Sequence, residues 1–324
     1  MLKCKHITVV VTNSCNMKCK NCYVGQKKEY IDFSMFQRHI LSEFINLGGE
    51  SIGFSGGEPL LFSQINACIK TAAEVGLETS LVTNGILLTK EKAFELKTLG
   101  LSRVQISLDV GNREENDNLR QDGGFETVVK QAIPSAIAAG LRTTLVAVPN
   151  IYLMQGLKEY LDLAAELGVN AVYFRRRIEM GDNLLSEHTK ETYYLFLQEL
   201  ESQKKNYNFP IFSGEPMQSV IRLKKEKRNI DKLFAGCSAG ITSLAVQTNG
   251  TVYPCTRLPI SLGNVRNEGL MSIWQKNSVL CELRLRRING KCGSCQYKYV
   301  CGGCRAATYY QVHDYQGADP MCCI

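Results

Sequence analysis

The sequence lacks the features that define several large classes of protein. No apolar run approaches the roughly 18 residues that span a membrane, and the first residues lead directly into a predicted strand instead of a signal peptide. No internal repeat, low-complexity tract or nucleic-acid-binding module is evident. We therefore expect a cytoplasmic globular protein with no membrane span and no nucleic-acid partner.

Cysteine, in contrast, is abundant. The 324-residue chain has 14 cysteines, and a chain of this length does not need disulfides to build a stable core. In a reducing cytoplasm, metal ligation is the expected use of paired cysteines. The net charge of +7 suits an acidic substrate or peptide but carries no information about the fold.

Three of the cysteines form a compact motif near the N-terminus. Cys15, Cys19 and Cys22 follow the first predicted strand with the spacing CxxxCxxC. A 4Fe–4S cluster normally takes four cysteines, so three leave one iron open to an outside ligand. A structural zinc site usually has two distant CxxC pairs, which this motif does not supply.

Strand-like and helix-like segments alternate along the first half of the chain. Helical periodicity covers 36–47, 65–75 and 157–167. Six apolar segments rich in β-branched residues read as strands, at 7–12, 51–54, 79–83, 104–108, 143–148 and 171–174. The alternation predicts a parallel sheet. In parallel α/β barrels the chemistry lies on the loops at the carboxyl ends of the strands, which is where the cysteine motif falls.

The motifs on these loops resemble those of the radical S-adenosylmethionine (SAM) superfamily. The second loop carries a GGEP element, the third Asn84-Gly85, and the fourth Ser107-Leu108-Asp109 with an arginine downstream. The resemblance implies an α/β fold, a partial (β/α)6 radical SAM barrel, in which SAM chelates the open iron of a 4Fe–4S cluster. The residues that it implies for SAM binding are Gly56, Gly57, Glu58, Asn84, Ser107, Asp109 and Arg120.

Within this set, the resemblance assigns the backbone and the acid of GGEP to the SAM amino group. It assigns Ser107 and Arg120 to the SAM carboxylate or ribose. Glycine allows a close backbone approach to a ligand, and the planar guanidinium of arginine pairs a carboxylate bidentately. Val110 departs from the family pattern, which has glycine after the aspartate.

The C-terminal cysteines follow a second pattern. It reads Cys237-x12-Gly250-x4-Cys255, then Cys292-x2-Cys295-x5-Cys301-x2-Cys304, then Cys322. Two CxxC pairs also fit a zinc ribbon, but here an upstream Thr-Asn-Gly-Thr-Val-Tyr-Pro-Cys hairpin accompanies them. The whole pattern resembles the SPASM extension of radical SAM enzymes, which holds two auxiliary iron–sulfur clusters.

The SPASM resemblance also implies which cysteines bind each auxiliary cluster. Cluster II receives Cys292, Cys295, Cys301 and Cys322. Cluster I receives Cys237, Cys255 and Cys304, with no cysteine at the usual fourth position. We therefore expect an open iron in cluster I, unless Asp231 or Cys323 closes it.

We expect three regions in the chain. Residues 1–180 form the radical SAM barrel, 181–230 a helical bridging region, and 231–324 the SPASM domain. Arg175, Arg176 and Arg177 end the sixth strand on the same rim as the SAM motifs. One of them is a candidate to pair with a substrate carboxylate, and a salt bridge to the barrel helices is the alternative.

The activity that the resemblance implies is reductive cleavage of SAM to a 5′-deoxyadenosyl radical, which takes hydrogen from a substrate. Modification of a ribosomally synthesised peptide or protein, by cross-linking, oxidation or epimerisation, is the first expectation. A tetrapyrrole decarboxylase of a haem pathway comes next, then an aminoglycoside or sugar dehydrogenase or epimerase. Thr256 stands where sulfatase-maturing relatives have an acid, which argues against that activity. A non-enzymatic iron–sulfur carrier is disfavoured because it has no use for SAM-binding motifs.

Two further expectations concern partners and one isolated cysteine. The enzyme needs an external low-potential electron donor. No leader-recognition domain precedes the barrel, so a peptide would be held by the barrel and SPASM surfaces or by a separate leader-peptide-binding protein. Cys281, in a helix-like stretch over 274–285, is a candidate hydrogen-atom donor if the enzyme is an epimerase, and otherwise a small buried residue.

Overall fold

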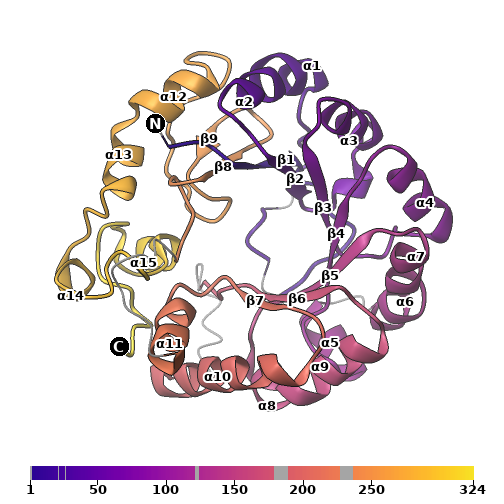
Figure 1. Ribbon diagram of the computed structural model, residues 1–324. Helices are drawn as coiled ribbons and strands as arrows, with labels where there is room; N and C mark the ends of the chain where they lie inside the picture. Colours follow the sequence, from indigo (N-terminus) through magenta and orange to yellow (C-terminus); the bar gives the residue numbers. More distant parts are fainter. Residues whose placement is uncertain (1, 21, 26, 121–123, 179–188, 227–235) are drawn as a thin grey trace. The chain divides into compact units, whose positions relative to one another are not determined.

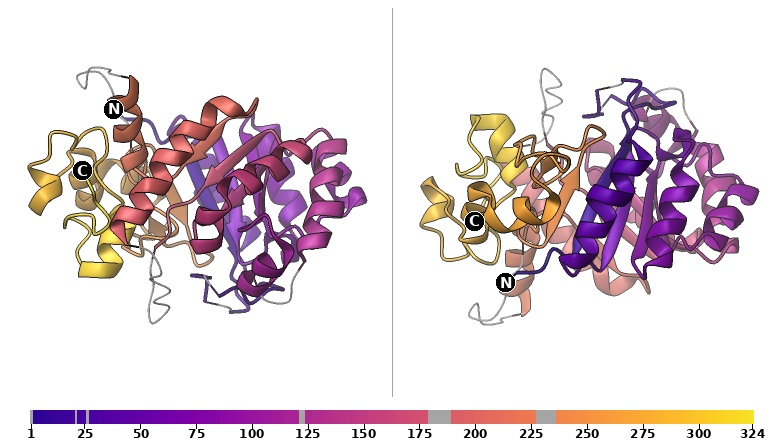
Figure 2. Two further views of the ribbon diagram at one scale, coloured as in Figure 1. Left: turned by 90° about the horizontal axis from the view of Figure 1, so that it is seen from below. Right: turned by 90° about the horizontal axis from the view of Figure 1, so that it is seen from above.

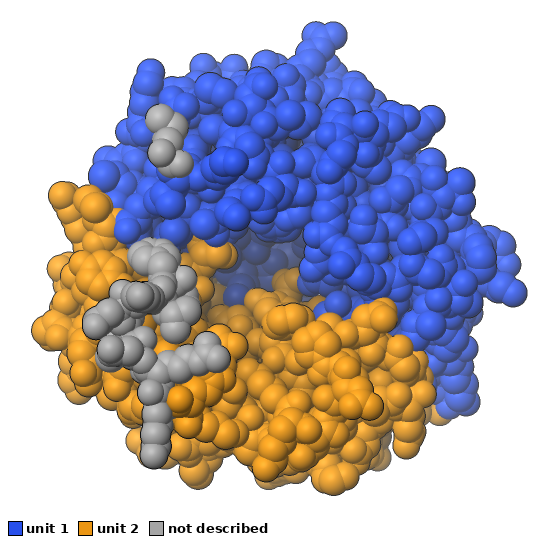
Figure 3. All heavy atoms as spheres, in the orientation of Figure 1, with its two compact units in different colours: residues 1–108, 117–144, 239–284 blue, residues 109–116, 145–238, 285–324 orange. Residues whose placement is uncertain are grey.

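The computed structural model describes residues 2–20, 22–25, 27–120, 124–178, 189–226 and 236–324. The chain divides into two compact units (Figure 3). Unit 1 comprises residues 1–108, 117–144 and 239–284, and unit 2 comprises 109–116, 145–238 and 285–324. Among the residues described, no helix is long and apolar enough to cross a membrane.

Unit 1 is built on a sheet whose strands lie in the order β4-β3-β2-β1-β8-β9 (Figure 1). Neighbours are parallel from β4 to β8, and β9 closes an antiparallel hairpin with β8. Apolar and β-branched residues explain the strands, because they pack well on a pleated surface; in β1 only two of the seven side chains are not buried. The strands are β1 (His6–Thr12), β2 (Ser51–Gly56), β3 (Glu78–Thr83), β4 (Arg103–Ser107), β8 (Ser243–Val246) and β9 (Val252–Tyr253).

The helices α2, α3 and α4 of unit 1 lie along one face of this sheet (Figures 1 and 2). Asp32 begins the first helical stretch by accepting the Met35 N–H, and Thr89 caps α4 through the Lys92 N–H. The helices are α1 (Phe33–Met35), α2 (Ser42–Asn46), α3 (Ile65–Glu74), α4 (Lys90–Thr98), α6 (Phe125–Thr127), α7 (Ile133–Ala138), α12 (Leu270–Lys276) and α13 (Ser278–Arg284). Short π-helical segments at 36–41 and 128–132 join α1 to α2 and α6 to α7.

Unit 2 has its own core of helices packed on two parallel strands, β6 (Ala171–Phe174) and β7 (Ile211–Ser213). The ring of Phe174 lies 5.8 Å from that of Tyr160 and 6.0 Å from that of Phe196, which joins β6 to two helices. The helices are α8 (Ile151–Gln155), α9 (Leu157–Glu166), α10 (Lys190–Gln203), α11 (Met217–Glu226), α14 (Gly290–Gly293) and α15 (Arg305–Val312). The strand β5 (Arg142–Ala147) and the helix α5 (Arg113–Arg120) are shared between the two units.

The six predicted strands are all present, and the predicted partial barrel is the observed fold class. Two local expectations need correction. The region expected to be a helical bridge also contains β7, a strand of three residues that is too short for periodicity to show. The stretch 274–285 is two helices and not one, because Asn277 ends α12 with an extended backbone and accepts the Leu280 N–H in α13.

The predicted domain boundaries at 180 and 230 fall outside the described residues and stay predictions.

Candidate functional site

The loop that leaves the carboxyl end of β1 carries Cys15, Cys19 and Cys22, with Cys22 exposed and the other two half-buried. The Cys22 N–H donates to the Cys19 carbonyl (3.2 Å), which turns the loop back on itself. The Met17 N–H donates to Cys15 Sγ (3.4 Å). Burial raises the pKa of the Cys15 thiol, and this hydrogen bond partly opposes the rise. Three accessible sulfurs with a backbone donor at one of them fit a cluster held by three cysteines.

Gly56 and Gly57 at the end of β2 clamp the second loop onto the start of this cysteine loop. The Gly57 N–H donates to the Thr12 carbonyl and the Glu58 N–H to the Ser14 carbonyl, each at 2.8 Å. A Cβ atom on Gly57 would lie 2.2 Å from the Ser14 oxygen, and one on Gly56 2.1 Å from the Thr12 oxygen. Only glycine lets the two backbones meet this closely.

The carboxylate of Glu58 is fully buried and bonded to protein donors on both oxygens. Oε1 accepts from the Leu60 N–H (3.0 Å) and the Thr83 hydroxyl (2.9 Å), and Oε2 accepts from the Asn84 N–H (2.8 Å). Burial raises the pKa of Glu58, and these bonds offset part of the rise. Glu58 therefore braces the loop after β2 against the loop after β3.

Asn84 continues this bracing to the cysteine loop. Its Nδ2 donates to Asn16 Oδ1 (2.7 Å) and lies 3.9 Å from Cys15 Sγ. Arg120, at the end of α5, is buried near enough to Glu58 to act on its pKa. Unit 1 thus gathers the cysteine loop, the GGEP element, Asn84 and Arg120. Ser107 ends β4 half-buried.

Asp109 belongs to unit 2, where its contacts are to neighbouring loops. Its Oδ1 accepts the Val148 N–H (3.0 Å), and its own N–H donates to Asn116 Oδ1 (3.0 Å). The side chain of Asn150 donates to its carbonyl (3.3 Å). These bonds hold the segment after β4 to the segment after β5, and the predicted contact of Asp109 with SAM stays a prediction.

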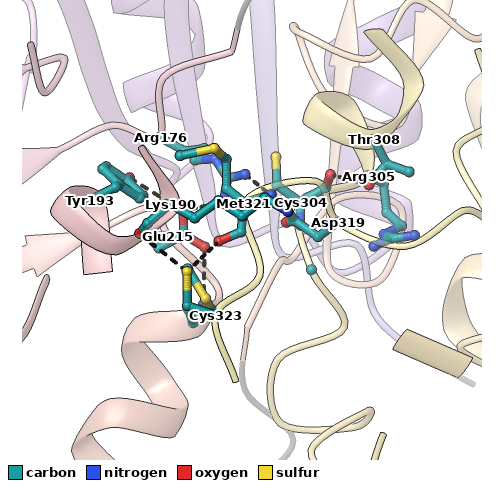
Figure 4. Close-up of polar contacts among 12 residues, drawn as sticks. Arg176, Lys190, Tyr193, Glu215, Cys304, Arg305, Thr308, Asp319, Met321 and Cys323 are labelled. Carbon is teal, nitrogen blue, oxygen red and sulfur yellow. Dashed lines mark hydrogen bonds and ion pairs between the residues drawn. The ribbon is translucent and has the colours of Figure 1, made fainter. Parts of the chain in front are cut away.

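The four cysteines predicted for auxiliary cluster II all lie in unit 2. Burial raises the pKa of Cys301 to about 12, and the nearby Cys292 adds to the rise. Burial also raises the pKa of Cys322, to which Cys292 and Cys295 contribute. Cys323 instead donates to the Lys190 carbonyl (3.2 Å; Figure 4). Of the two adjacent cysteines, Cys322 is therefore the one beside the other predicted ligands.

Two of the cysteines predicted for cluster I, Cys237 and Cys304, also lie in unit 2, whereas Cys255 belongs to unit 1. Gly236 packs so tightly on the backbone before Cys304 that an added Cβ would lie 2.3 Å from the Cys301 carbonyl. The buried Arg286 donates to the Cys237 carbonyl (3.4 Å). These contacts hold Cys237 beside the second CxxC pair. The role of Cys255 as a ligand of the same cluster stays a prediction.

Arg176 forms ion pairs within the protein. It is buried at the end of β6, where it forms ion pairs with Glu215 and, at 2.7 Å, with Asp319 (Figure 4). Burial opposes its charge, but the two carboxylates outweigh burial and raise its pKa well above the ordinary value. Burial would raise the pKa of Asp319, but Arg176 and the Cys304 N–H hold it below its usual range. Arg176 therefore forms salt bridges, as the alternative expected, but with Glu215 and Asp319, which lie on loops and not on barrel helices.

Comparison with known proteins decides between the possible cofactors of these cysteines. The radical SAM superfamily profile matches residues 9–164, and the SPASM profile, described as an iron-sulfur cluster-binding domain, matches residues 237–304. The chain belongs to the radical SAM superfamily. The SPASM match replaces the zinc-ribbon alternative with auxiliary iron–sulfur clusters.

Two relatives and one solved structure show the breadth of this similarity. An AdoMet-dependent heme synthase of Methanosarcina barkeri is 28% identical over 331 residues, covering 96% of this chain and 94% of its own. The mycofactocin maturase MftC of Mycolicibacterium smegmatis is 28% identical over 98% of this chain and 82% of its own. SuiB of Streptococcus suis, solved with its precursor peptide SuiA, has a TM-score of 0.81 at 18% identity, covering 100% of this chain and 77% of that one.

This radical SAM protein has a SAM-binding 4Fe–4S cluster, auxiliary iron–sulfur clusters and SAM as its cofactors. In the described part of the chain, no three Cys, His, Asp or Glu side chains converge as ligands of a single metal ion do. Cube ligands need not converge in this way, because each cysteine binds a different iron. When bound, the first cluster supplies the electron that cleaves SAM.

Some predictions about this radical SAM protein are wrong, are untested or concern residues outside those described. Cys281 is exposed on α13, so the alternative of a buried apolar residue is wrong, and its proposed hydrogen-donor role is untested. Asp231 lies outside the described residues. Sequence reasoning also missed Thr83 and Asn16, and it gave no role to Asp319, three residues before Cys322. Only contact with Glu58, Asn84 or Arg176 reveals them.

Proposed function

We propose that this radical SAM enzyme is a maturase that modifies a ribosomally synthesised peptide or protein. The reaction begins with reductive cleavage of SAM and takes hydrogen from the substrate, with a cross-link, oxidation or epimerisation as the outcome. The similarity to a mycofactocin maturase along 98% of the chain supports the peptide substrate. The fold shared with SuiB, a protein solved with its precursor peptide, is compatible with it.

The observation that carries this choice is the burial of Arg176 between two carboxylates. A tetrapyrrole with propionate groups needs cations that can pair with it. Arg176 was one of three arginines offered by the sequence for a substrate carboxylate, and its charge is already neutralised by Glu215 and Asp319. A peptide can instead be held through its backbone along the barrel and SPASM surfaces.

The second candidate function is a tetrapyrrole decarboxylase of a haem pathway. The observation that favours it is the similarity to an AdoMet-dependent heme synthase over 96% of this chain and 94% of that relative. The cluster scaffold is shared by enzymes with different substrates, so this similarity speaks to ancestry more than to chemistry.

The deciding experiment measures substrate-dependent formation of 5′-deoxyadenosine by the reduced, reconstituted enzyme. One reaction contains the product of a short reading frame beside the gene, and the other an iron-bound porphyrin with propionate side chains. A peptide that accelerates SAM cleavage and loses hydrogen, or gains deuterium from D2O, supports the maturase. Release of carbon dioxide from the porphyrin, with no effect of the peptide, would establish the decarboxylase instead.

The proposal also names partners. An external low-potential electron donor reduces the SAM-binding cluster, and a separate leader-peptide-binding protein is proposed to present the substrate.

For auxiliary cluster I we propose an open fourth iron. Added thiols should then change the spectrum of this cluster, and Asp231→Ala should leave it unchanged. Selective damage to the cluster in Asp231→Ala would show that Asp231 closes it.

A further inference from the structure

Asp319 contacts one predicted ligand of each auxiliary cluster. Its backbone N–H donates to Cys292 Sγ (3.4 Å), a predicted ligand of cluster II. Its Oδ2 accepts the backbone N–H of Cys304 (2.6 Å), a predicted ligand of cluster I. Three residues later the chain reaches Cys322, another predicted ligand of cluster II. One residue therefore touches the protein scaffold of both sites.

Arg176 fixes the position of this aspartate. It reaches across 143 positions of sequence from the end of β6 and donates to Asp319 Oδ1 (2.7 Å). Oδ1 also accepts the Met321 N–H (3.0 Å), so the carboxylate has donors on both oxygens. Arg176 is itself held by Glu215 on its other side, and all three side chains are almost inaccessible to water (Figure 4). A charge-assisted network without water has little freedom to shift.

The glycine before Cys304 makes room for the contact of Asp319 with the Cys304 N–H. Gly303 has a positive φ of 62°, which disfavours other residues. A Cβ at this position would lie 2.8 Å from Asp319 Cβ. The absence of a side chain at Gly303 thus lets Asp319 reach the Cys304 N–H.

We propose that Asp319 is a positioning residue shared by the two auxiliary clusters, and that Arg176 anchors it to the barrel strand β6. Asp319 holds the ligands Cys292 and Cys304 at a fixed separation, so the two clusters are assembled and perturbed together. This inference rests on the cysteine assignments, and it does not depend on which substrate the enzyme modifies.

The test compares two substitutions that each neutralise one carboxylate on the same buried arginine. In Asp319→Asn the amide oxygen remains at the Oδ1 position, because two donors, Arg176 and the Met321 N–H, point there. The amide NH2 then faces the Cys304 N–H, and that hydrogen bond is lost. Glu215→Gln is the matched control, because Glu215 hydrogen-bonds Arg176, Tyr193 and the Met217 N–H but no predicted cluster ligand. Both carboxylates act on Cys301 through their charge, so the control removes a charge near that cysteine as well.

The measurements are made on full-length protein in which Cys15, Cys19 and Cys22 are replaced by alanine, so that only the auxiliary clusters remain. They are the melting temperature, the rate of iron loss to a chelator, and the electron paramagnetic resonance spectrum of the reduced clusters. Both substitutions should lower the melting temperature. Only Asp319→Asn should accelerate iron loss several-fold and change the signals of both clusters, because hydrogen bonding near the sulfurs tunes an iron–sulfur cluster.

Equal behaviour of Asp319→Asn and Glu215→Gln would overturn the inference, as would a change confined to one cluster. If Asp319→Asn does not fold, Arg176→Lys replaces it. Lysine keeps the charge but not the two-sided pairing, and iron loss at the wild-type rate in that variant would also overturn the inference. Cys292→Ala and Cys304→Ala test the assignment of these cysteines as cluster ligands separately from the role of Asp319. Full iron in both would overturn the cluster assignment along with the inference, whereas iron loss there leaves Asp319 to be judged on its own.

Discussion

The cysteine loop of unit 1 and the cysteine-rich region of unit 2 differ in how exposed their cysteines are. In unit 1, Cys15, Cys19 and Cys22 lie half-buried or exposed on one loop. Of the six predicted ligands in unit 2, Cys292 and Cys304 are buried and the other four are half-buried, and their surroundings include a fully buried ion group. The first site has to admit SAM and leaves Cys22 exposed, whereas none of the predicted ligands in unit 2 is exposed.

The two regions also differ in what holds their cysteines. The loop in unit 1 is positioned mainly by backbone contacts, in which Gly57 and Glu58 donate to the carbonyls of Thr12 and Ser14. The region in unit 2 is positioned by side chains, above all the pairing of Asp319 with Arg176. A loop held by its backbone leaves its sulfurs accessible, whereas a buried ion group fixes the ligands at the cost of burying charge.

The largest expected effect comes from removing the cysteines themselves. Protein with three cubes should hold about twelve irons per chain, and the Cys15, Cys19 and Cys22 to alanine variant should lose about four of them. That variant should also lose all SAM cleavage, because no iron remains to bind and reduce SAM. Iron analysis and 5′-deoxyadenosine formation under reduction measure both.

The matched variant, Cys292→Ala with Cys295→Ala, should lose about four irons or more, because the two auxiliary clusters are proposed to assemble together, but it should retain SAM cleavage. SAM cleavage that survives the first set of substitutions, or zinc at the C-terminal cysteines, would break the contrast between the two regions.

The next effect tests the backbone clamp in unit 1. Gly57→Ala places a methyl group 2.2 Å from the Ser14 carbonyl. We expect destabilisation of about 1–3 kcal/mol and loss of the SAM-binding cluster, while the auxiliary clusters remain. Gly25→Ala is the control, because a Cβ there meets no atom within 4 Å. Thermal unfolding and iron content measure the effect. If the two variants behave alike, the close contact of Gly57 with Ser14 is not needed for the cluster.

The SAM contact expected of Arg120 gives a smaller effect. Arg120→Ala should weaken SAM binding roughly 10- to 100-fold, which corresponds to a lost hydrogen bond to a charged group, with little change in the cluster spectrum. Anaerobic titration calorimetry measures the affinity. Arg113→Ala, an exposed arginine on the same helix, serves as control. Unchanged affinity in Arg120→Ala would remove this residue from the site.

The same contrast explains what could be predicted from sequence. The cysteine loop and the GGEP element are each a continuous stretch of sequence, so the short spacings within them identify these motifs. Runs of β-branched residues such as that of β1 identify strands. The sequence does not reveal that Glu58 is bonded to Thr83 and Asn84, because that depends on how two loops meet, and its predicted contact with SAM stays a prediction.

Long-range pairing is the second limit. Arg176 and Asp319 are 143 positions apart, and nothing in the sequence around either residue indicates the other as its partner. The three arginines at the end of β6 were noticeable in the sequence, but only the fold shows that one of them is buried against carboxylates from two other segments.

The smallest expected effect concerns a half-buried titratable group in unit 1, which contrasts with the charged group buried in unit 2. His6 begins β1, and its ring nitrogens contact the hydroxyls of Ser51 (2.9 Å) and Thr8 (3.2 Å). Burial, assisted by the charge of Arg103, lowers the pKa of His6 to about 4. Unit 1 therefore holds a neutral, half-buried imidazole, whereas unit 2 buries Arg176 as a cation.

The sign of the resulting pH dependence follows from proton binding. The unfolded chain takes up a proton on His6 near the ordinary pKa of 6.5, whereas the folded chain does so only near 4. Between these values the unfolded chain binds more protons, so the stabilisation is complete above pH 6.5 and is lost as the pH falls toward 4. From pH 7.5 to 5.5 the loss is about 1 kcal/mol. Urea unfolding at both pH values should show this extra loss in the wild type and not in His6→Asn, and parallel losses in the two proteins would mean that the folded chain does not keep His6 neutral.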